Sequence, residues 1–192
     1  YMKIGIDLGG SHIAVAIITE EGRILEKQEE NIIVSNIENI KENNIEKIIR
    51  IINAVLRNAQ VPSFVIEEIG IGFPGIIENN IIKKCDKYEI YNWDLAERLE
   101  KHYQVSVKLQ NDALCAAKAE KEYGNLNEIK RGVFICFGTG IGGATIINEE
   151  VIPSEFGHMI IEKDGNLCSC GRRGCFETYS SMGAFKNKIV EV

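Results

Sequence analysis

The sequence predicts an α/β fold, because segments with the period of a strand alternate along the chain with segments with the period of a helix. Apolar and polar residues alternate from Lys3 to Leu8, which is typical of a strand. Between residues 45 and 59 the apolar residues recur at helical spacing and form one face of an amphipathic helix. A strand pattern at 105–109 is followed closely by a second helical segment at 113–123.

Length and composition indicate a soluble globular protein. The 192 residues allow one large domain or two small ones, and 45% hydrophobic with 26% charged residues is ordinary for this class. A net charge of -6 argues against nucleic acid as the main partner, and no apolar run is long enough to span a membrane. Six cysteines without an even framework favour a reducing compartment, so we expect a cytoplasmic protein. Three of them are expected to be buried or partly buried thiols: Cys85, Cys115 and Cys136.

The first turn of the chain carries candidate phosphate chemistry. Three strands are expected before the first helix, at 4–8, 13–18 and 24–33. The turn between the first two reads Asp7-Leu8-Gly9-Gly10-Ser11. Gly9 and Gly10 let backbone N–H groups approach an anion, Ser11 adds a hydroxyl donor, and Asp7 can hold hydrated Mg2+ beside phosphate. The same pattern also forms ordinary hairpin turns, so the motif alone leaves both interpretations open.

The next strand leads to a second turn of interest. The helix at 45–59 ends before Pro62, and a strand follows at 65–73. It runs into a glycine-rich turn closed by Pro74-Gly75, where backbone can approach a ligand closely; a plain strand-ending turn fits equally well. Residues 76–91 are polar and irregular, so we expect a loop or a short hairpin there.

A carboxylate lies between a predicted strand and a predicted helix. Helices are expected at 95–103, with Asp94 as N-cap and Trp93 in the core before it, and at 113–123, with Gly124 as C-cap. The strand at 105–109 ends at Gln110-Asn111-Asp112. Asp112 therefore lies at the carboxyl end of a strand, where α/β proteins place catalytic groups. It can equally be only the cap of the helix that follows.

A second glycine-rich turn follows a later strand. A hairpin is expected from strands at 132–137 and 144–147, joined by Gly138-Thr139-Gly140-Ile141-Gly142-Gly143. This turn is a second candidate anion cradle. It is neither a P-loop, because no G-K-[ST] follows, nor a Rossmann turn, because strand-turn-strand is the wrong context.

The stretch from Glu155 to Glu177 reads EFGHMIIEKDGNLCSCGRRGCFE and predicts a metal site. Its candidate ligands are His158, Cys168, Cys170 and Cys175. Three thiolates and one imidazole suit tetrahedral zinc, and four protein ligands leave no open position for water, so such a site is structural. The alternatives are three unrelated thiols beside a surface histidine, or a disulfide, which would leave one cysteine unpaired.

Two carboxylates flank this candidate site. Glu155 lies three residues before His158, and Glu177 lies two residues after Cys175. Zinc on one imidazole nitrogen of His158 leaves the other N–H free to donate outward. Two carboxylates and one such donor suit a ligand with many hydroxyl groups. The alternative is that both are solvated surface residues.

Together these motifs resemble the ROK family of sugar kinases and regulators, which have an actin/hexokinase-like (ribonuclease H-like) fold. Asp7 to Ser11 is similar to the first phosphate motif of the family, and Gly138 to Gly143 is similar to its second. The pattern of Glu155, Gly157-His158, C-S-C-G-R-R-G-C and Glu177 is similar to the family signature with its zinc site. The resemblance covers nearly the whole chain.

The resemblance implies an enzyme that phosphorylates a hexose with Mg2+ and ATP, glucose to glucose 6-phosphate being the first choice. Asp112 would be the general base. The implied sugar-binding residues are Gly75, Asn111, Asp112, Glu155, His158 and Glu177. The implied phosphate-binding residues are Asp7, Gly9, Gly10, Ser11, Gly138, Thr139, Gly140, Gly142 and Gly143.

The sequence departs from the family at several points. Ser11 replaces the usual Thr and keeps the hydroxyl, whereas His12 stands where Lys or Asn is common and is expected to have no catalytic role. Family members continue beyond residue 192, and their adenosine-contacting segment lies there. We therefore expect an N-terminal domain at 1–115, an incomplete second domain at 116–192 with the zinc loop, and poor catalysis by this form.

Two other functions remain open. A ROK-type regulator would bind sugar and act through DNA, but family regulators carry a helix-turn-helix before the first phosphate motif, and this chain is acidic and starts at that motif. A zinc-stapled interaction module without catalysis would not need Asp112 or both glycine-rich turns. Among kinases, fructose, mannose and N-acetylmannosamine are alternative sugars. The resemblance also suggests a homodimer.

Overall fold

The computed structural model describes residues 1–9, 12–31, 40–85 and 88–190. The chain divides into two compact units, residues 1–112 and residues 113–192. The expected boundary between functional domains after residue 115 stays a prediction. Gly10, Ser11 and the last two residues of the strand expected at 24–33 lie outside the described residues.

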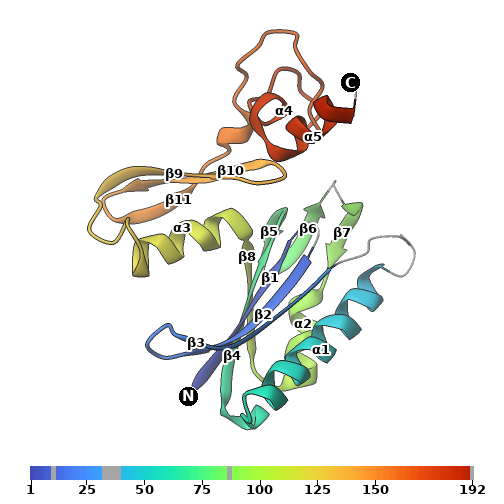
Figure 1. Ribbon diagram of the computed structural model, residues 1–192, viewed down its shortest axis with the longest axis vertical. Coiled ribbons are helices and arrows are strands. Elements are labelled where there is room, and N and C mark those ends of the chain that lie inside the picture. The colour runs from blue at the N-terminus through green and yellow to red at the C-terminus, as the bar shows by residue number, and fades with distance from the viewer. Residues whose placement is uncertain (10–11, 32–39, 86–87, 191–192) are drawn as a thin grey trace. The chain divides into compact units, whose positions relative to one another are not determined.

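The first unit is built on a mixed five-stranded sheet in the order β3-β2-β1-β4-β8 (Figure 1). Its strands are β1 (Met2–Leu8), β2 (His12–Thr19), β3 (Ile24–Asn31), β4 (Ile66–Phe73) and β8 (Ser106–Asn111). The first three are antiparallel neighbours, whereas β4 runs parallel to both β1 and β8. The carboxyl ends of β1, β4 and β8 therefore meet at one edge of the sheet, where ligands bind in open α/β sheets.

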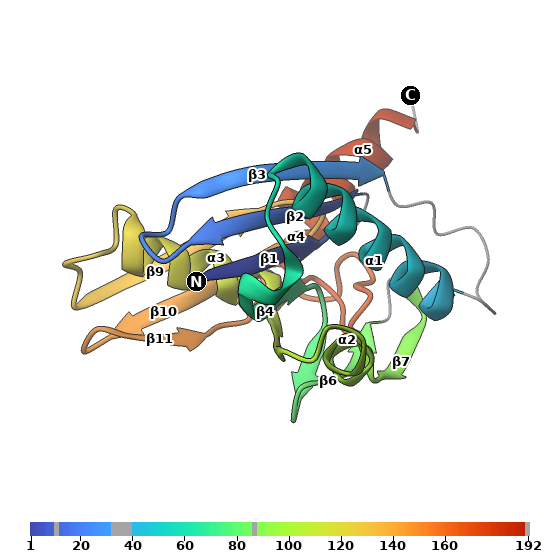
Figure 2. The ribbon, with the colours of Figure 1, turned by 90° about the horizontal axis from the view of Figure 1, so that it is seen from below.

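Two helices cover one face of this sheet (Figure 2). They are α1 (Ile40–Asn58) and α2 (Leu95–Tyr103). The alternation in β1 directs Ile4, Ile6 and Leu8 into the same buried cluster as Ile48 and Leu99 of the helices. Asp94 holds the N-cap position of α2, but its carboxylate pairs with Nε of Arg98 at 3.3 Å and makes no capping hydrogen bond.

The segment after β4 forms a small antiparallel sheet in the order β5-β6-β7. Its strands are β5 (Ile76–Glu78), β6 (Ile81–Cys85) and β7 (Ile90–Trp93). The short hairpin that the sequence allows is β5–β6, turning at Asn79 and Asn80 with φ of 50° and 62°. The third strand was not predicted. It buries Trp93 completely, with its ring centroid 6.1 Å from that of Phe73, which confirms Trp93 as a core residue.

The second unit contains a three-stranded antiparallel sheet, in the order β11-β10-β9. Its elements are β9 (Arg131–Phe137), β10 (Ile141–Ile147), β11 (Glu150–Pro153), α4 (Glu177–Ser180) and α5 (Met182–Val190), together with α3 (Asp112–Tyr123), whose first residue belongs to the first unit. Leu114 and Ala117 of α3 pack against Ala144 of the sheet. Cys136 on β9 is exposed, so the expectation that it is buried was wrong; Cys85 is buried and Cys115 half-buried.

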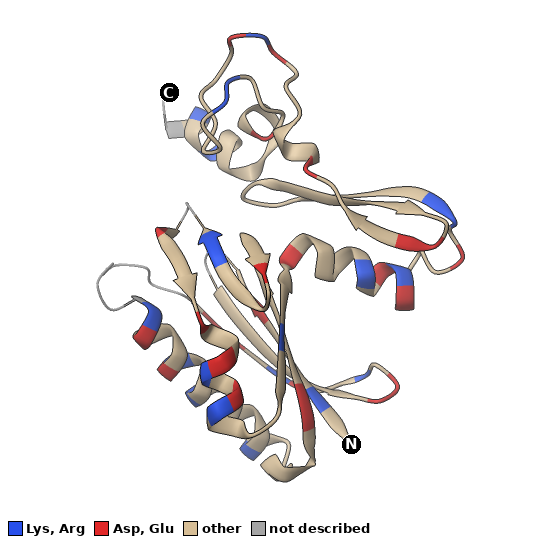
Figure 3. Cartoon of the chain, turned by 180° about the vertical axis from the view of Figure 1, so that it is seen from behind, with Lys and Arg blue, Asp and Glu red and all other residues tan. Residues whose placement is uncertain are grey.

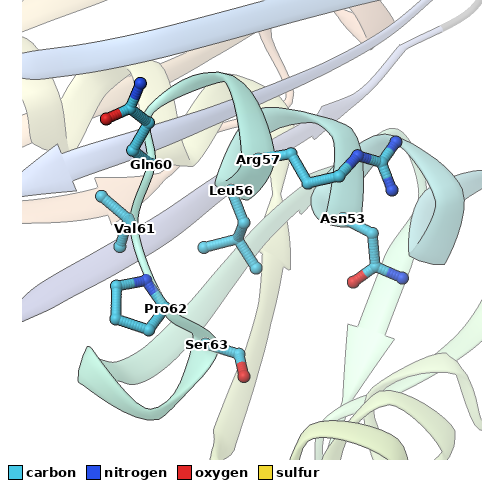
Figure 4. Close-up of a pocket in the computed structure, with 7 residues that line it drawn as sticks. All are labelled: Asn53, Leu56, Arg57, Gln60, Val61, Pro62 and Ser63. Carbon is cyan, nitrogen blue, oxygen red and sulfur yellow. The ribbon is translucent and has the colours of Figure 1, made fainter.

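Charged residues of both signs are interspersed along α1, α2 and α3 (Figure 3). Arg98 of α2 pairs with Glu42 of α1 at 2.6 Å, and Arg50 of α1 pairs with Glu30 of β3. A shallow pocket lies where α1 ends and turns toward β4 (Figure 4), lined by Asn53, Leu56, Arg57, Gln60, Val61, Pro62 and Ser63. This pocket is at the amino end of β4, away from the edge where the carboxyl ends meet. Among the described residues, no helix has the length and apolar character needed to cross a membrane.

Candidate functional site

The four predicted metal ligands converge in the second unit. Their donor atoms, from His158, Cys168, Cys170 and Cys175, all lie within 4.8 Å of one another. Sγ of Cys168 is 3.6 Å from Nδ1 of His158, and Sγ of Cys170 is 3.7 Å from Sγ of Cys175. In a tetrahedron with zinc–sulfur bonds near 2.3 Å, two sulfurs would be about 3.8 Å apart. Two donor pairs therefore already have tetrahedral spacing, and the whole set is compact enough to close on a metal ion with small side-chain shifts.

Backbone hydrogen bonds shape the loop that presents these sulfurs. The N–H of Cys168 donates to the carbonyl of Arg172 at 2.8 Å, and an isolated β-bridge joins Ile160 to Cys175. Gly174 has φ of 80°, and a Cβ there would lie 1.7 Å from the carbonyl oxygen of Glu162. Only glycine fits that position. The loop is thus held by close backbone contacts, which bring the ligands together despite its polar sequence.

The three thiols differ in their electrostatic environment. Burial, helped by the carboxylate of Glu177, raises the pKa of Cys168 to about 12. Although burial opposes it, hydrogen bonds from the backbone N–H and guanidinium of Arg172 lower the pKa of Cys170 to about 6. Burial and the charge of Cys170 raise the pKa of Cys175. A divalent cation would offset the cost of holding several thiolates this close together.

Both flanking carboxylates reach the imidazole of His158, on opposite sides. Oε1 of Glu177 lies 3.7 Å from Nδ1 of His158 and accepts a hydrogen bond from Sγ of Cys168 at 3.2 Å. Oε2 of Glu155 lies 4.0 Å from Nε2 of His158. The side chain of Glu155 is 82% exposed and that of Glu177 is 18% exposed. Nδ1 thus faces the sulfurs, while Nε2 faces outward beside an exposed carboxylate.

The glycine-rich turn between β9 and β10 lies beside the same carboxylate. A Cβ at Gly140 would lie 2.8 Å from Oε2 of Glu177, and one at Gly143 would lie 2.5 Å from the carbonyl oxygen of Phe134. The N–H of Gly138 donates to the carbonyl of Gly140 at 2.9 Å, which closes the turn. Of the sequence-predicted groups, the structure therefore brings the metal ligands, both glutamates and this turn together within one unit.

The sequence reasoning missed the residues that follow Glu177. Ser181 is buried, and its Oγ accepts a hydrogen bond from the N–H of Ala184 at 3.1 Å, so it caps α5. The N–H groups of Met182 and Gly183 donate to the carbonyls of Gly138 and Thr139. The sequence signal for this cap is weak, because Ser180 fits the cap position as well as Ser181 does and no Glu or Gln stands three residues after Ser181.

In the first unit, Asp7 and Gly9 lie at the carboxyl end of β1. Nε2 of His12 is 3.7 Å from Oδ2 of Asp7, and the two side chains are about half exposed. The N–H of Gly9 donates to the carbonyl of His12 at 3.0 Å, so the turn is closed across its base. The expectation that His12 has no catalytic role stays a prediction.

Asn111 and Asp112 lie where β8 passes directly into α3. Nδ2 of Asn111 donates to the carbonyl of Gly75 at 3.4 Å, so the structure joins two of the predicted sugar-binding residues. Gly75 has φ of 151°, and a Cβ there would lie 2.6 Å from the carbonyl oxygen of Lys84. The pKa of Tyr88 is raised to about 12 by burial, with contributions from the charges of Cys85 and Asp112. This buried phenol near Asp112 was not singled out from the sequence.

Comparison with known proteins places this arrangement in a family. The model of the ROK family matches residues 3–191. A glucokinase of Thermotoga maritima is 34% identical over 98% of this chain, and a xylose repressor of Bacillus spizizenii is 33% identical over 97%. The chain spans 60% of the length of the first relative and 50% of the second.

Solved structures agree with the family match. A ROK family glucokinase from Streptomyces griseus, in complex with glucose and AMPPNP, superimposes with a TM-score of 0.80 and 28% identity, covering 94% of this chain and 57% of its own. A ROK family transcriptional regulator, 23% identical, has the same fold with a TM-score of 0.83. The mixed α/β fold is therefore that of ROK hexokinase-like proteins, of which this chain covers a part. Since the family model spans both units almost from end to end, the chain belongs to the ROK family.

Proposed function

We propose that this chain carries the sugar site and the phosphate-binding turns of an ATP-dependent hexose kinase, with glucose as the preferred sugar. The observation that carries the proposal is the pair of carboxylates on either side of His158, which is itself held at a Cys3His cluster. Two carboxylates can accept hydrogen bonds from several hydroxyl groups, and the imidazole between them can donate one to another hydroxyl. The similarity to glucokinases supports glucose as the first sugar to test.

We assign a structural zinc ion to His158, Cys168, Cys170 and Cys175, on the chemistry of the donors and their spacing. With Nδ1 of His158 toward the metal, Nε2 would carry the proton and donate to a sugar hydroxyl. Glu155 and Glu177 would accept hydrogen bonds from sugar hydroxyls. Zinc, when bound, would hold the imidazole in one orientation and take no part in proton or phosphoryl transfer.

In the proposed reaction Asp112 is the general base. Its carboxylate would accept the proton of the attacking sugar hydroxyl as that oxygen bonds to the γ-phosphorus of ATP. Asn111 would orient the sugar from the neighbouring position, and its bond to the carbonyl of Gly75 holds its amide in place. Displacement of ADP completes the transfer, and the product is a sugar phosphate.

Backbone N–H groups of the two glycine-rich turns would bind the ATP phosphates, with Mg2+ neutralising their charge. The residues assigned this role are Asp7, Gly9, Gly10 and Ser11 in the first turn, and Gly138, Thr139, Gly140, Gly142 and Gly143 in the second. Gly10 and Ser11 lie outside the described residues, so their assignment rests on the motif alone.

A second candidate function is that of a sugar-sensing regulator. It is favoured by the xylose repressor of Bacillus spizizenii, which is nearly as similar to this chain as the glucokinase is. Both functions require a sugar site. Only the kinase requires a base at position 112 and phosphate binding at both turns.

Calorimetric titration of the zinc-loaded chain with glucose, fructose, mannose, N-acetylmannosamine and xylose tests the proposal. We expect saturable glucose binding that is weakened by roughly 10- to 100-fold in Glu177→Gln and retained in Glu162→Gln, which changes an exposed glutamate in the same loop. We also expect Mg-ATP to bind more tightly in the presence of glucose. A preference for xylose over the hexoses would favour the regulator, and a folded, zinc-loaded chain that binds none of the sugars would overturn the proposed site.

A further inference from the structure

The start of α5 is bonded directly to the turn between β9 and β10. The N–H of Met182 donates to the carbonyl of Gly138 at 2.9 Å, and the N–H of Gly183 donates to the carbonyl of Thr139 at 3.3 Å. The first N–H groups of a helix have no partner within the helix. Here they serve two carbonyls of the glycine-rich turn, so the position of α5 decides the orientation of those peptide groups.

The planarity of the peptide bond determines where the N–H groups next to these carbonyls point. In a trans peptide the carbonyl of one residue and the N–H of the next point in opposite directions. Because the carbonyls of Gly138 and Thr139 point toward α5, the N–H groups of Thr139 and Gly140 point away from it. Two adjacent donors are thus presented on the side of the turn opposite to α5, an arrangement that suits a phosphate group.

The start of α5 is also connected by hydrogen bonds and contacts to the Cys3His cluster. The N–H of Ser181 donates to the carbonyl of Glu177 at 3.2 Å, while Oγ of Ser181 caps α5 by accepting from Ala184. Glu177 follows Cys175 by two residues, and the N–H and Oγ of its neighbour Thr178 both donate to the carbonyl of Cys175, at 3.0 and 2.7 Å. Oε2 of Glu177 lies beside Gly140. Ser181 is 5% exposed, which leaves it little freedom to change partners. A continuous series of short contacts therefore runs from Cys175 through Glu177 and Ser181 to Gly138.

We infer that Ser181 is a positioning residue, which together with Gly183 transmits the geometry of the Cys3His cluster to the turn Gly138–Gly143 and so sets its N–H groups for a polyphosphate. That the anion is the polyphosphate of a nucleotide rests on the proposed function, whereas the connection between cluster and turn does not. Loss of the metal would loosen the turn even though no turn residue is a ligand.

Hydrogen–deuterium exchange of the zinc-loaded chain tests the connection. The reporters are peptides spanning 137–142 and 181–185, which contain the amides of Gly138, Met182 and Gly183. We expect Ser181→Ala to raise their exchange rate by roughly tenfold, the effect of a lost N-cap, with zinc content unchanged. Ser180→Ala, an exposed neighbour, is the matched control and should leave the rates unchanged. Chelation should accelerate the same peptides in the unsubstituted chain.

Gly183→Ala separates positioning from simple helix stability. Alanine is the better helix former, so a purely structural role predicts slower exchange in α5. A Cβ at this position would lie 2.6 Å from the carbonyl oxygen of Thr139 and push the turn away, so positioning predicts faster exchange in both peptides. Unchanged or slower exchange in Gly183→Ala, or no response of the turn to chelation, would overturn the inference.

Ligand binding completes the test. Ser181→Ala should weaken the affinity for Mg-ATP by about tenfold while glucose affinity stays within about twofold, and Ser181→Thr, which keeps the hydroxyl, should restore Mg-ATP affinity. An equal loss of both affinities would assign Ser181 a general structural role and contradict the inference. If the unsubstituted chain binds neither ligand, the proposed function fails, and the exchange data alone decide on the connection.

Discussion

Oε1 of Glu177 lies 3.2 Å from Sγ of Cys168, so a residue proposed to bind sugar is in direct contact with a proposed metal ligand. The same carboxylate is 3.7 Å from Nδ1 of His158. Sugar binding at Glu177 would therefore respond to changes in the geometry of the cluster, and the cluster would orient the side chain of Glu177. This contact is the arrangement expected if the loop combines the proposed structural metal with the proposed sugar site.

Glu177→Gln separates these two roles. The amide keeps the shape of the side chain but loses the charge, and a hydrogen bond to a charged group contributes about 1.5–3 kcal/mol. We expect sugar affinity to fall by roughly 10- to 100-fold while the chain still binds one equivalent of zinc. Calorimetry with glucose and metal analysis of the purified variant measure both quantities. Loss of zinc with the sugar would show that Glu177 is needed for the cluster itself.

Cys175→Ser should remove the metal and destabilise the second unit alone. Cys175 is fully buried in the cluster, and a structural metal site contributes several kcal/mol to the loop that it closes. For a unit of this size the loss lowers Tm by on the order of 10–20 °C. Cys136→Ser is the matched control, because Cys136 is exposed and outside the cluster.

Trp93 shows whether the effect of Cys175→Ser is confined to one unit. It is the only tryptophan, and it lies in the core of the first unit. The unfolding midpoint followed by Trp93 fluorescence should be the same with and without the metal. Far-UV circular dichroism of the metal-free variant should show an additional unfolding transition at lower temperature. A parallel shift of both signals would mean that the two units unfold together.

The sequence predicted the elements that have a clear period. The alternation in β1, the stripe of α1 and the passage from β8 to α3 were all recognisable, because burial on one face imposes the pattern. The strands β7 and β11 were missed. Each has four residues, too few to show a period, and the turn before β11 relies on Asn148 and Glu149 with positive φ.

The candidate site was predictable to the extent that its residues are close in the sequence. The spacing of Cys168, Cys170 and Cys175 predicted a cluster, and the structure brings their donor atoms together with that of His158. The bonds from α5 to the glycine-rich turn join residues more than 40 positions apart. Such contacts follow from the path of the chain, which no local pattern encodes.

Gly75→Ala should destabilise the first unit, whereas Gly70→Ala should be tolerated. Gly75 has φ of 151°, and its Cβ would lie 2.6 Å from the carbonyl oxygen of Lys84; at Gly70 nothing lies within 4 Å of the added carbon. Backbone strain of this kind costs about 1–3 kcal/mol. Denaturant unfolding followed by Trp93 fluorescence measures the difference. Equal midpoints for the two variants would show that the turn at Gly75 adapts freely.

Glu68→Gln should reduce the pH dependence of stability in the first unit. Hydrogen bonds from Lys108 and Lys3, the latter at 3.1 Å, lower the pKa of Glu68 below its ordinary value. A carboxyl whose pKa is lower in the folded chain stabilises it above the unfolded pKa, about 4.3, and this stabilisation is lost as the pH falls through the folded pKa. The group is partly exposed, so we expect about 1 kcal/mol or less at pH 7.

The comparison is between unfolding midpoints at pH 7 and pH 3, followed by Trp93 fluorescence so that titration of the cysteine cluster does not enter. At pH 7 Glu68→Gln should be less stable than the unsubstituted chain, and this difference should shrink as the pH falls toward 3, because protonation of the carboxyl removes the charge that both lysines contact. Glu67→Gln, at the exposed neighbouring position, is the control. A constant difference between Glu68→Gln and the unsubstituted chain across this range would mean that packing of the side chain, rather than its charge, contributes the stability.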